Sequence, residues 1–335
     1  MAMNGDPKQQ TAVPHLTQVG FTTANAEAAA EFFEGTLGFS RGISCDIDGG
    51  PYTELIDLPG SKIKLVQLHL GNETLQLTQV LSLGPALRSA RPIPSDSRSC
   101  DLWFQHICIV VDDLEAASAK ALAAIANGAL GRVSSAPQTL PQWNTAAAGI
   151  MAFKFQDPEG HNLELLQFPP DKGEPRWHAA TAGGSPFLGI DHSAISIANT
   201  APSCRFYDEL LGLRLGGDGV NSGPTQDHLD GLEHTEVRIT GHRCPTGAGI
   251  ECLNYLPPNQ GRPMPHDLGA QDLAHWHIQL KVGDLDAIVS RVESFGGQLI
   301  SPGIVELGEQ AELIGSHRAL QLTDPDGHRL QVLQA

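Results

Sequence analysis

The amino-acid sequence predicts an α+β fold that is built from four βαβββ units. One turn and strand occur twice, as DPEGHNLELLQF at 157–168 and as DPDGHRLQVLQ at 324–334, half a chain apart. Upstream of these, FQHICIVVDDLEAA at 104–117 matches HWHIQLKVGDLDAI at 275–288. Repetition at a fixed spacing is the sequence signature of a duplicated structural unit. We therefore expect the two halves of the chain to contain the same elements.

The first and third units each begin with a strand and a helix. TQVGFTTANAEAAAEFFEGTLGF at 17–39 aligns without a gap on DHSAISIANTAPSCRFYDELLGL at 191–213. Each copy starts with alternating apolar residues and continues with an amphipathic pattern that stops at glycine, which predicts a strand and then a helix. In the second copy Phe206, Leu210 and Leu213 are spaced to share one helical face.

Further strands follow these helices. The stretches with strand character are YTELIDL (52–58), IKLVQL (63–68), TLQLTQV (74–80), TEVRIT (235–240) and GIECLNYL (249–256). Glycines separate them, as is typical of strands joined by turns. In the repeated DP(E/D)GH turns, Asp and Pro begin the turn, while Gly160 and Gly327 permit a positive φ. The coarse order of elements in each unit is therefore strand, helix and three strands.

A polar segment rich in Gly and Pro lies at 168–187, between the second and third units. Such composition is typical of a connection between domains. We expect a flexible or disordered N-terminus at 1–12, a first domain at 13–170, a linker at 171–187 and a second domain at 188–335. Each domain would contain two units.

Composition narrows the class of partner. The chain has 335 residues, with 38 acidic against 21 basic ones and a formal net charge of -17. This charge repels nucleic acid and anionic lipid, and no apolar run is long enough to cross a membrane. The start of the chain lacks the pattern of a secretion signal. We expect a soluble, cytoplasmic monomer or homodimer that binds a small molecule.

The repeated pattern resembles the vicinal oxygen chelate superfamily, which includes glyoxalases, bleomycin-resistance proteins and extradiol dioxygenases. The resemblance rests on tandem βαβββ units, an H-x-A-(I/L) first strand, a helix that ends in FYxxxLG(F/L) and a last strand that follows DP(D/E)G. It implies that two units combine into a cup-shaped mixed sheet flanked by helices. It also implies a divalent metal, held by side chains from the first and last strand of each unit.

These ligand positions can be transferred to every unit. The first-strand positions are Gln18, His106, His192 and His277, and the last-strand positions are Gln76, Glu164, Glu251 and Gln331. Imidazole and carboxylate groups suit Fe, Mn, Ni, Zn or Co. With the units paired in chain order, as we expect, the better metal site combines His192, Glu251 and His277, with Gln331 nearby. The weaker one combines His106 and Glu164, with Gln18 and Gln76 nearby. The resemblance implies no organic cofactor.

Some roles remain open at the level of sequence. His275 lies two residues before His277, so both point to the same side of a strand and either is a candidate ligand. The candidate catalytic groups are Glu164, Glu251 and His275. His161 and His328, inside the repeated turns, are interpreted as turn residues.

Three functions are compatible with this pattern. The first is a metal-dependent lyase or isomerase of the glyoxalase type that acts on a small, oxygen-rich substrate. The second is an extradiol ring-cleavage dioxygenase, but the Tyr and Glu that the last unit of that family carries are Gln321 and Gln331 here, and Lys154 occupies the Tyr position in the second unit. The third is a protein that sequesters a small ligand without catalysis, like the bleomycin-resistance members.

Overall fold

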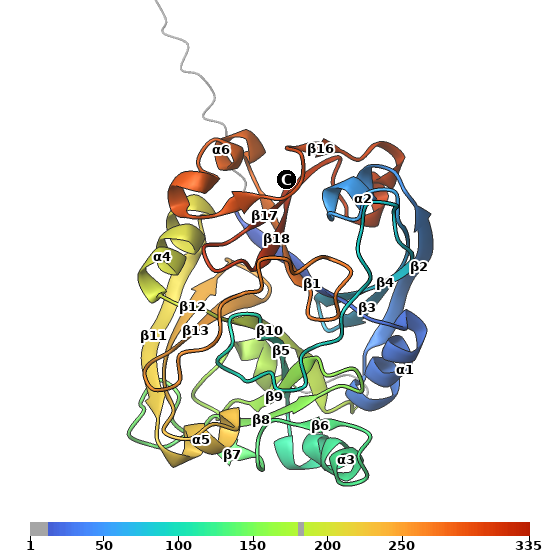
Figure 1. Cartoon of the computed structure of the whole chain (residues 1–335). Helices are drawn as coiled ribbons and strands as arrows, with labels where there is room; N and C mark the ends of the chain where they lie inside the picture. The colour runs from blue at the N-terminus through green and yellow to red at the C-terminus, as the bar shows by residue number, and fades with distance from the viewer. Residues whose placement is uncertain (1–12, 180–183) are drawn as a thin grey trace, which may run out of the picture.

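The computed structural model describes residues 13–179 and 184–335, and it contains two mixed sheets of nine strands each with helices packed against them (Figure 1). This confirms the predicted α+β class and the pairing of units into shared sheets. The predicted flexible segment at 1–12 lies outside the described residues, as does part of the predicted linker.

Sheet A, as we call the first sheet, has the order β15-β17-β18-β14-β1-β4-β3-β2, and β16 pairs with β17. Its strands are β1 (His15–Thr22), β2 (Ser40–Asp48), β3 (Lys62–Leu70), β4 (Glu73–Ser82), β14 (Trp276–Val282), β15 (Gln298–Leu299), β16 (Val305–Glu306), β17 (Arg318–Thr323) and β18 (Arg329–Gln334). It therefore contains the first and the fourth unit.

Sheet B, the second sheet, has the order β11-β12-β13-β10-β5-β9-β8-β6, and β7 pairs with β8. Its strands are β5 (Gln105–Val111), β6 (Gly131–Arg132), β7 (Gln138–Thr139), β8 (Met151–Gln156), β9 (Asn162–Gln167), β10 (Phe187–Ser196), β11 (Arg214–Ser222), β12 (Glu236–Arg243) and β13 (Gly249–Tyr255). It contains the second and the third unit.

This topology corrects the expected pairing of units in chain order. β1 joins β14 and β5 joins β10, both antiparallel, so each sheet takes one unit from each half of the chain. The first strand of every unit offers an open edge, and the strand pattern does not specify which two edges meet. Long connections at 83–104 and 256–275 carry the chain from one sheet to the other, whereas the connection from β9 to β10 stays within sheet B.

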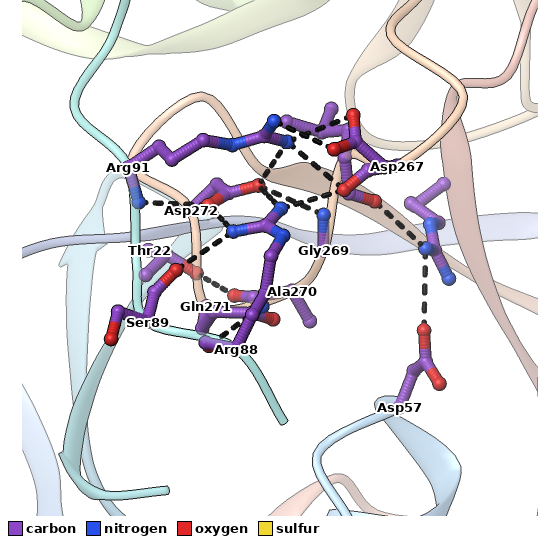
Figure 2. A network of polar contacts seen from close by, with 12 residues as sticks. Thr22, Asp57, Arg88, Ser89, Arg91, Asp267, Gly269, Ala270, Gln271 and Asp272 are labelled. Atoms are coloured by element: carbon purple, nitrogen blue, oxygen red, sulfur yellow. Dashed lines mark hydrogen bonds and ion pairs between the residues drawn. The ribbon is translucent and has the colours of Figure 1, made fainter. Parts of the chain in front are cut away.

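The two long connections are held together by a network of ion pairs (Figure 2). Arg88 donates from Nη1 to Oδ1 of Asp272 over 2.7 Å, and Arg91 donates from Nη2 to Oδ2 of the same carboxylate over 3.0 Å. The Asp272 carboxylate also accepts from the backbone N–H groups of Arg91 and Gly269. Arg91 binds Asp267 as well. One buried carboxylate thus fixes both connections.

The helices occupy the connections between strands. Within 13–179 and 184–335 they are α1 (Ala26–Leu37), α2 (Pro51–Leu55), α3 (Leu114–Ala126), α4 (Thr200–Cys204), α5 (Pro224–Asp230) and α6 (Leu285–Val289), with one π-helix, η2 (Arg205–Leu210), and three short 3-10 helices, η1 (Pro175–His178), η3 (Val292–Phe295) and η4 (Gly308–Leu313). In each unit an Asn or Asp side chain accepts a hydrogen bond from a backbone N–H group in the first turn of the first helix. This cap fixes where that helix begins.

The predicted strand at 52–58 is wrong, because its first half belongs to α2 and residues 56–58 form no strand. Gly50 has φ 86° and Pro51 occupies the first helical turn, where its ring favours helix and cannot extend a strand ladder. The other four strand predictions coincide with β3, β4, β12 and β13. The helix predicted around Phe206 is present as α4 followed by η2, and it ends at Gly212, where φ is 77°.

One hydrophobic core connects the two sheets. Phe21 and Phe33 of the first unit, Phe153 of the second and Phe206 of the third belong to the same buried cluster. The opposite face of each sheet carries polar groups together with smaller apolar clusters. Among the described residues, no helix has the length and apolar character that a membrane span requires.

Candidate metal centre

Sheet B brings four side chains of metal-binding type, two histidines and two glutamates, together at its centre. His106 lies on β5, Glu164 on β9, His192 on β10 and Glu251 on β13, four strands that are neighbours in the sheet. In the strand register Cys108 pairs with both Glu164 and His192. The antiparallel join between β5 and β10 therefore sets the ligand positions of two units side by side.

The distances define a compact cluster. His106 Nε2 lies 3.1 Å from Glu164 Oε2, and His192 Nε2 lies 3.3 Å from Glu251 Oε2. His192 Nε2 is also 3.8 Å from Glu164 Oε2. One ligand atom from each of His106, Glu164 and His192 can be chosen so that all lie within 4.8 Å of one another. A single ion between these atoms would reach every one of them after small side-chain movements.

The orientation of His192 favours a metal ion. Its Nδ1 is 2.8 Å from Asp191 Oδ2, and Arg243 binds the same carboxylate over 2.7 Å. Burial works against the charge of Asp191, but His192 and Arg243 hold the pKa of this carboxyl well below its ordinary value. Because the ionised carboxylate only accepts, Nδ1 must carry the proton. Nε2 is then the metal-facing nitrogen, in the carboxylate and histidine arrangement common at metal sites.

An unpartnered nitrogen supports the same interpretation. Within the described part of the chain, His192 Nε2 is buried and has no hydrogen-bond partner, although it lies in the cluster. Leaving a buried polar atom unsatisfied destabilises a fold by about 1–3 kcal/mol. Two imidazoles and two carboxylates around such an atom match the ligand preferences of divalent transition metals, so the residues present fit a metal ion.

The two carboxylates of the cluster, Glu164 and Glu251, lie in different environments. Burial would raise the pKa of Glu164, but the neighbouring His106 and Lys154 lower it to about 2. Glu164 is therefore ionised at neutral pH. Glu251 is more accessible, with 28% of its side chain exposed. Burial lowers the pKa of His106 itself, whereas the pKa of His192 is raised because Glu251 and Asp191 outweigh its burial.

A cavity of about 240 Å³ opens over the cluster, and Glu164, His192 and Glu251 contribute to its wall. Its polar lining also includes Lys154 and Arg243. The apolar wall is made by Leu140, Ala146, Ala147, Ile150, Ala152, Leu166, Phe168, Leu229, Ile239 and Leu253. A volume of this size suits a small molecule with an apolar part.

The grouping of ligands expected from sequence is thus wrong, although the repeat positions are those that meet. His277 and Gln331 lie on β14 and β18 of sheet A, away from His192 and Glu251. The cluster in sheet B takes half of its residues from each predicted site. A clue was present in the sequence, since the two units that carry both His and Glu are consecutive and are joined by the connection that stays within one sheet.

Sheet A carries amides where sheet B carries carboxylates. Gln18 donates to Gln76 over 3.1 Å, and Gln76 donates to the Tyr52 hydroxyl over 2.9 Å. Gln331 accepts from Gln279. Apolar residues of α2 and η4, among them Leu55 and Ala311, fill the space beside this face. Without a carboxylate, this face is a poor site for a divalent cation.

His275 and His277 both belong to the sheet A side. They are buried, and their ring centroids lie 5.9 Å apart. Burial lowers the pKa of His277 to about 4 and that of His275 well below its ordinary value, so both rings are neutral at pH 7. Neither histidine reaches the cluster in sheet B, which removes the structural basis for His275 as a catalytic group there.

The histidines of the repeated turns have structural partners, as predicted. His161 Nδ1 lies 2.8 Å from Asp157 Oδ2, and its Nε2 lies 2.9 Å from the backbone oxygen of Thr22. His328 Nε2 lies 2.7 Å from the backbone oxygen of Ser196. The two contacts with backbone oxygens each tie a unit of one sheet to the first strand of a unit in the other.

Comparisons with known proteins agree with this architecture. The family model of the Glyoxalase/Bleomycin resistance protein/Dioxygenase superfamily matches residues 13–165 and 189–332. Sequence comparison with curated proteins finds no match. A crystal structure of a mutant of glyoxalase I from Zea mays is similar over 96% of this chain and 94% of that chain, with 14% identity and a TM-score of 0.58.

Two further solved structures share the fold. Unmutated glyoxalase I from Zea mays is similar over 96% of this chain and 92% of that chain, with 12% identity and a TM-score of 0.55. A Bacillus subtilis protein that is thought to be a dioxygenase is similar over 95% of this chain and 84% of that chain, with 11% identity and a TM-score of 0.53. At such identities the likeness concerns the fold alone. Because the family model matches most of the sequence, this chain belongs to the Glyoxalase/Bleomycin resistance protein/Dioxygenase superfamily.

Proposed function

We propose that the protein is a metal-dependent enzyme, a lyase or isomerase of the glyoxalase type, and that its active site is the cluster in sheet B. The observation that carries the proposal is the meeting of His106, Glu164, His192 and Glu251 in one cluster, with the last three at the wall of one small cavity. Two imidazoles and two carboxylates give a neutral site once a divalent cation is bound.

A bound divalent cation would polarise a substrate carbonyl and make the neighbouring C–H group more acidic. The chain would supply the groups that hold the ion and move the proton. His106 and Glu164 are buried and contact each other, which suits them to a fixed ligand role. Arg243 and Asp191 keep the His192 ring oriented.

Glu251 is the carboxylate best suited to proton transfer. Its side chain is the most accessible of the four, and it lines the cavity beside His192. Glu164, with a pKa of about 2, is too weak a base for this role at neutral pH. We expect Glu251 to take a proton from the substrate carbon and return it to the neighbouring carbon, while the apolar wall excludes water.

Ring cleavage is less well supported. The position where extradiol enzymes carry a Tyr is Lys154 in the second unit, and its ammonium is bound to Asp230 over 2.7 Å. A ligand-sequestering protein would need no pair of imidazoles beside two carboxylates, which is the donor set of a divalent metal site. We therefore rank both alternatives below a metal-dependent enzyme.

Metal analysis of purified variants tests the proposal. Wild-type protein should hold about one divalent ion per chain at full occupancy. His192→Ala should abolish binding, whereas the matched variant His277→Ala, which removes a buried histidine from sheet A, should keep it. Circular dichroism would establish that both variants fold. Retention of metal by folded His192→Ala, or its loss only from His277→Ala, would refute the assignment.

Activity supplies the second arm of this test. Metal-loaded protein should catalyse exchange of the carbon-bound protons of hydroxyacetone with solvent deuterium, followed by NMR. Glu251→Gln should slow this exchange about 100-fold or more, which is the usual contribution of a positioned acid or base. An undiminished rate in Glu251→Gln with bound metal would exclude it as the base.

A further inference from the structure

A buried ion pair lies next to the metal cluster and has no part in the chemistry described above. Lys154 on β8 pairs in the strand register with Glu164 on β9, so its side chain lies on the same face of sheet B. Its Nζ donates to Oδ1 of Asp230, at the end of α5, over 2.7 Å. Exposed fractions of the two side chains are 5% and 0%.

A chain of amides fixes this pair in place. Gln226 donates to Asp230 Oδ2 over 2.7 Å, and Asn221 donates to Gln226 Oε1 over 3.1 Å. Asn144 donates in turn to Asn221 Oδ1. Three of these groups, Asn144, Asn221 and Gln226, line the same cavity as the metal cluster. The cavity wall therefore holds the Lys154 ammonium in a defined position.

Stability alone does not account for such a pair. Withdrawing two charges from water is unfavourable, and buried ion pairs add little net stability compared with well-packed apolar residues. Lysine carries three N–H donors, and within the described part of the chain Asp230 is the partner of one. The pair thus places spare donors of a cation on the wall of a small cavity.

Lys154 stays protonated throughout the physiological range. Burial would lower the pKa of this ammonium, but the bound Asp230 carboxylate outweighs burial and raises it. Such a group cannot act as a base at neutral pH, although it can bind or stabilise negative charge. The other cationic side chain among the lining residues, Arg243, is already bound to the Asp191 carboxylate and to its backbone oxygen.

We propose that Lys154 binds an anionic oxygen of the substrate beside the metal ion, so that the enzyme selects small ligands with a carboxylate or an enolate next to their chelating oxygens. The inference rests on the proposed function, because it requires metal at His106, Glu164 and His192, beside Glu251. It adds a specificity-determining residue and a substrate class. Asp230 and Gln226 act as positioning residues, since Asp230 accepts from the ammonium and Gln226 holds the Asp230 carboxylate.

Two probes of the same shape test this role. Oxalate and oxamate are both small planar chelators, but oxamate has an amide in place of one carboxylate and carries one negative charge fewer. Each would be titrated into Co(II)-loaded protein, with the visible Co(II) spectrum as the readout. Lys154→Met should weaken oxalate binding about tenfold or more, since a charge-assisted hydrogen bond is lost, and should change oxamate binding less than threefold.

Asp230→Asn provides the opposite test. It removes the negative charge that neutralises Lys154, so oxalate should bind more tightly than to the wild type, by about threefold or more. A merely structural role for the ion pair would give lower stability in both variants with no opposite change in oxalate affinity. Lys154→Met leaves Asp230 buried and unpaired, which can prevent folding. In that case the double variant Lys154→Met with Asp230→Asn, which removes both charges, is titrated in place of the single variant.

The outcomes separate this inference from the proposed function. Wild-type protein that takes up no Co(II) would overturn the proposed function and this inference with it. Normal Co(II) uptake with equal oxalate affinity in the wild type and in Lys154→Met, or the double variant, would overturn the role of Lys154 alone. An equal loss of oxalate and oxamate affinity would also overturn it, because the effect would not depend on ligand charge.

Discussion

His106 on β5 and His192 on β10 face each other across the antiparallel join of two units, with ring centroids 6.0 Å apart. The join places the first-strand position of the second unit beside that of the third. Each histidine brings the carboxylate of its own unit, Glu164 or Glu251, into the same cluster. The candidate site is thus a product of sheet pairing rather than of either unit alone.

Glu164 and Gln331 occupy the same last-strand position in two units, and we expect exchanges at these two residues to affect metal binding unequally. Glu164→Gln should lower affinity for Zn(II) or Mn(II) by about tenfold or more, because it replaces a charged oxygen ligand by a neutral amide of nearly the same size. Gln331→Glu, the reverse exchange in sheet A, should leave the stoichiometry of bound metal unchanged. Metal titration of the two variants side by side measures the difference. A gain of a second metal in Gln331→Glu would show that sheet A also contains a site.

The contact between Asp191 and His192 predicts an indirect effect on metal affinity. Asp191→Asn keeps the size of the side chain but removes the ionised acceptor for His192 Nδ1. Affinity for Zn(II) should fall about 10- to 100-fold, as is usual when such a supporting carboxylate is lost. Asp218→Asn makes the same exchange in an exposed ion pair with Arg238 and serves as the control. Equal affinities in the two variants would contradict the orienting role of Asp191.

Much of the fold and the ligand positions, but not their grouping, could be predicted from the sequence. The repeats reveal strands, helices and turns because each follows from a local pattern of apolar residues, caps and glycines. Which open strand edges meet depends on the long connections at 83–104 and 256–275, whose path is set by ion pairs such as that of Arg88 with Asp272. Those contacts join residues 184 positions apart, which no local pattern reveals.

The network in Figure 2 predicts a dependence of stability on pH. Burial disfavours the charge of Asp272, but Arg88 and Arg91 hold the pKa of this carboxyl well below its ordinary value. A carboxyl with a lowered folded pKa stabilises the protein above its unfolded pKa of about 4. This contribution should be lost progressively as the pH falls below about 4 toward the folded pKa.

Asp272→Asn should therefore destabilise the protein near neutral pH and have a smaller effect at pH 3. We expect the free energy of unfolding to fall by about 2 kcal/mol at pH 7, a moderate value because both arginines are partly exposed to solvent. Asp267→Asn is the matched control, since its carboxylate binds Arg91 at an exposed position. Denaturant unfolding at the two pH values measures both variants, and a difference that does not change with pH would exclude the charge of Asp272 as the cause.

The packing of His277 over Gly20 gives a last prediction, which separates sheet A from the metal centre. A Cβ atom added at Gly20 would lie 2.3 Å from Cε1 of the His277 ring, so Gly20→Ala forces the ring out of its place. Overpacking of this kind destabilises a core by about 1–3 kcal/mol. Because His277 lies outside the cluster in sheet B, metal content should stay at the wild-type level.

The double variant Gly20→Ala with His277→Ala should be more stable than the sum of its single variants predicts, since the truncated side chain makes room for the new methyl group. Denaturant unfolding of the four proteins gives this coupling free energy, and metal analysis of the same samples gives occupancy. Loss of metal from folded Gly20→Ala would mean that His277 does contribute to the site, against the assignment made from the strand order.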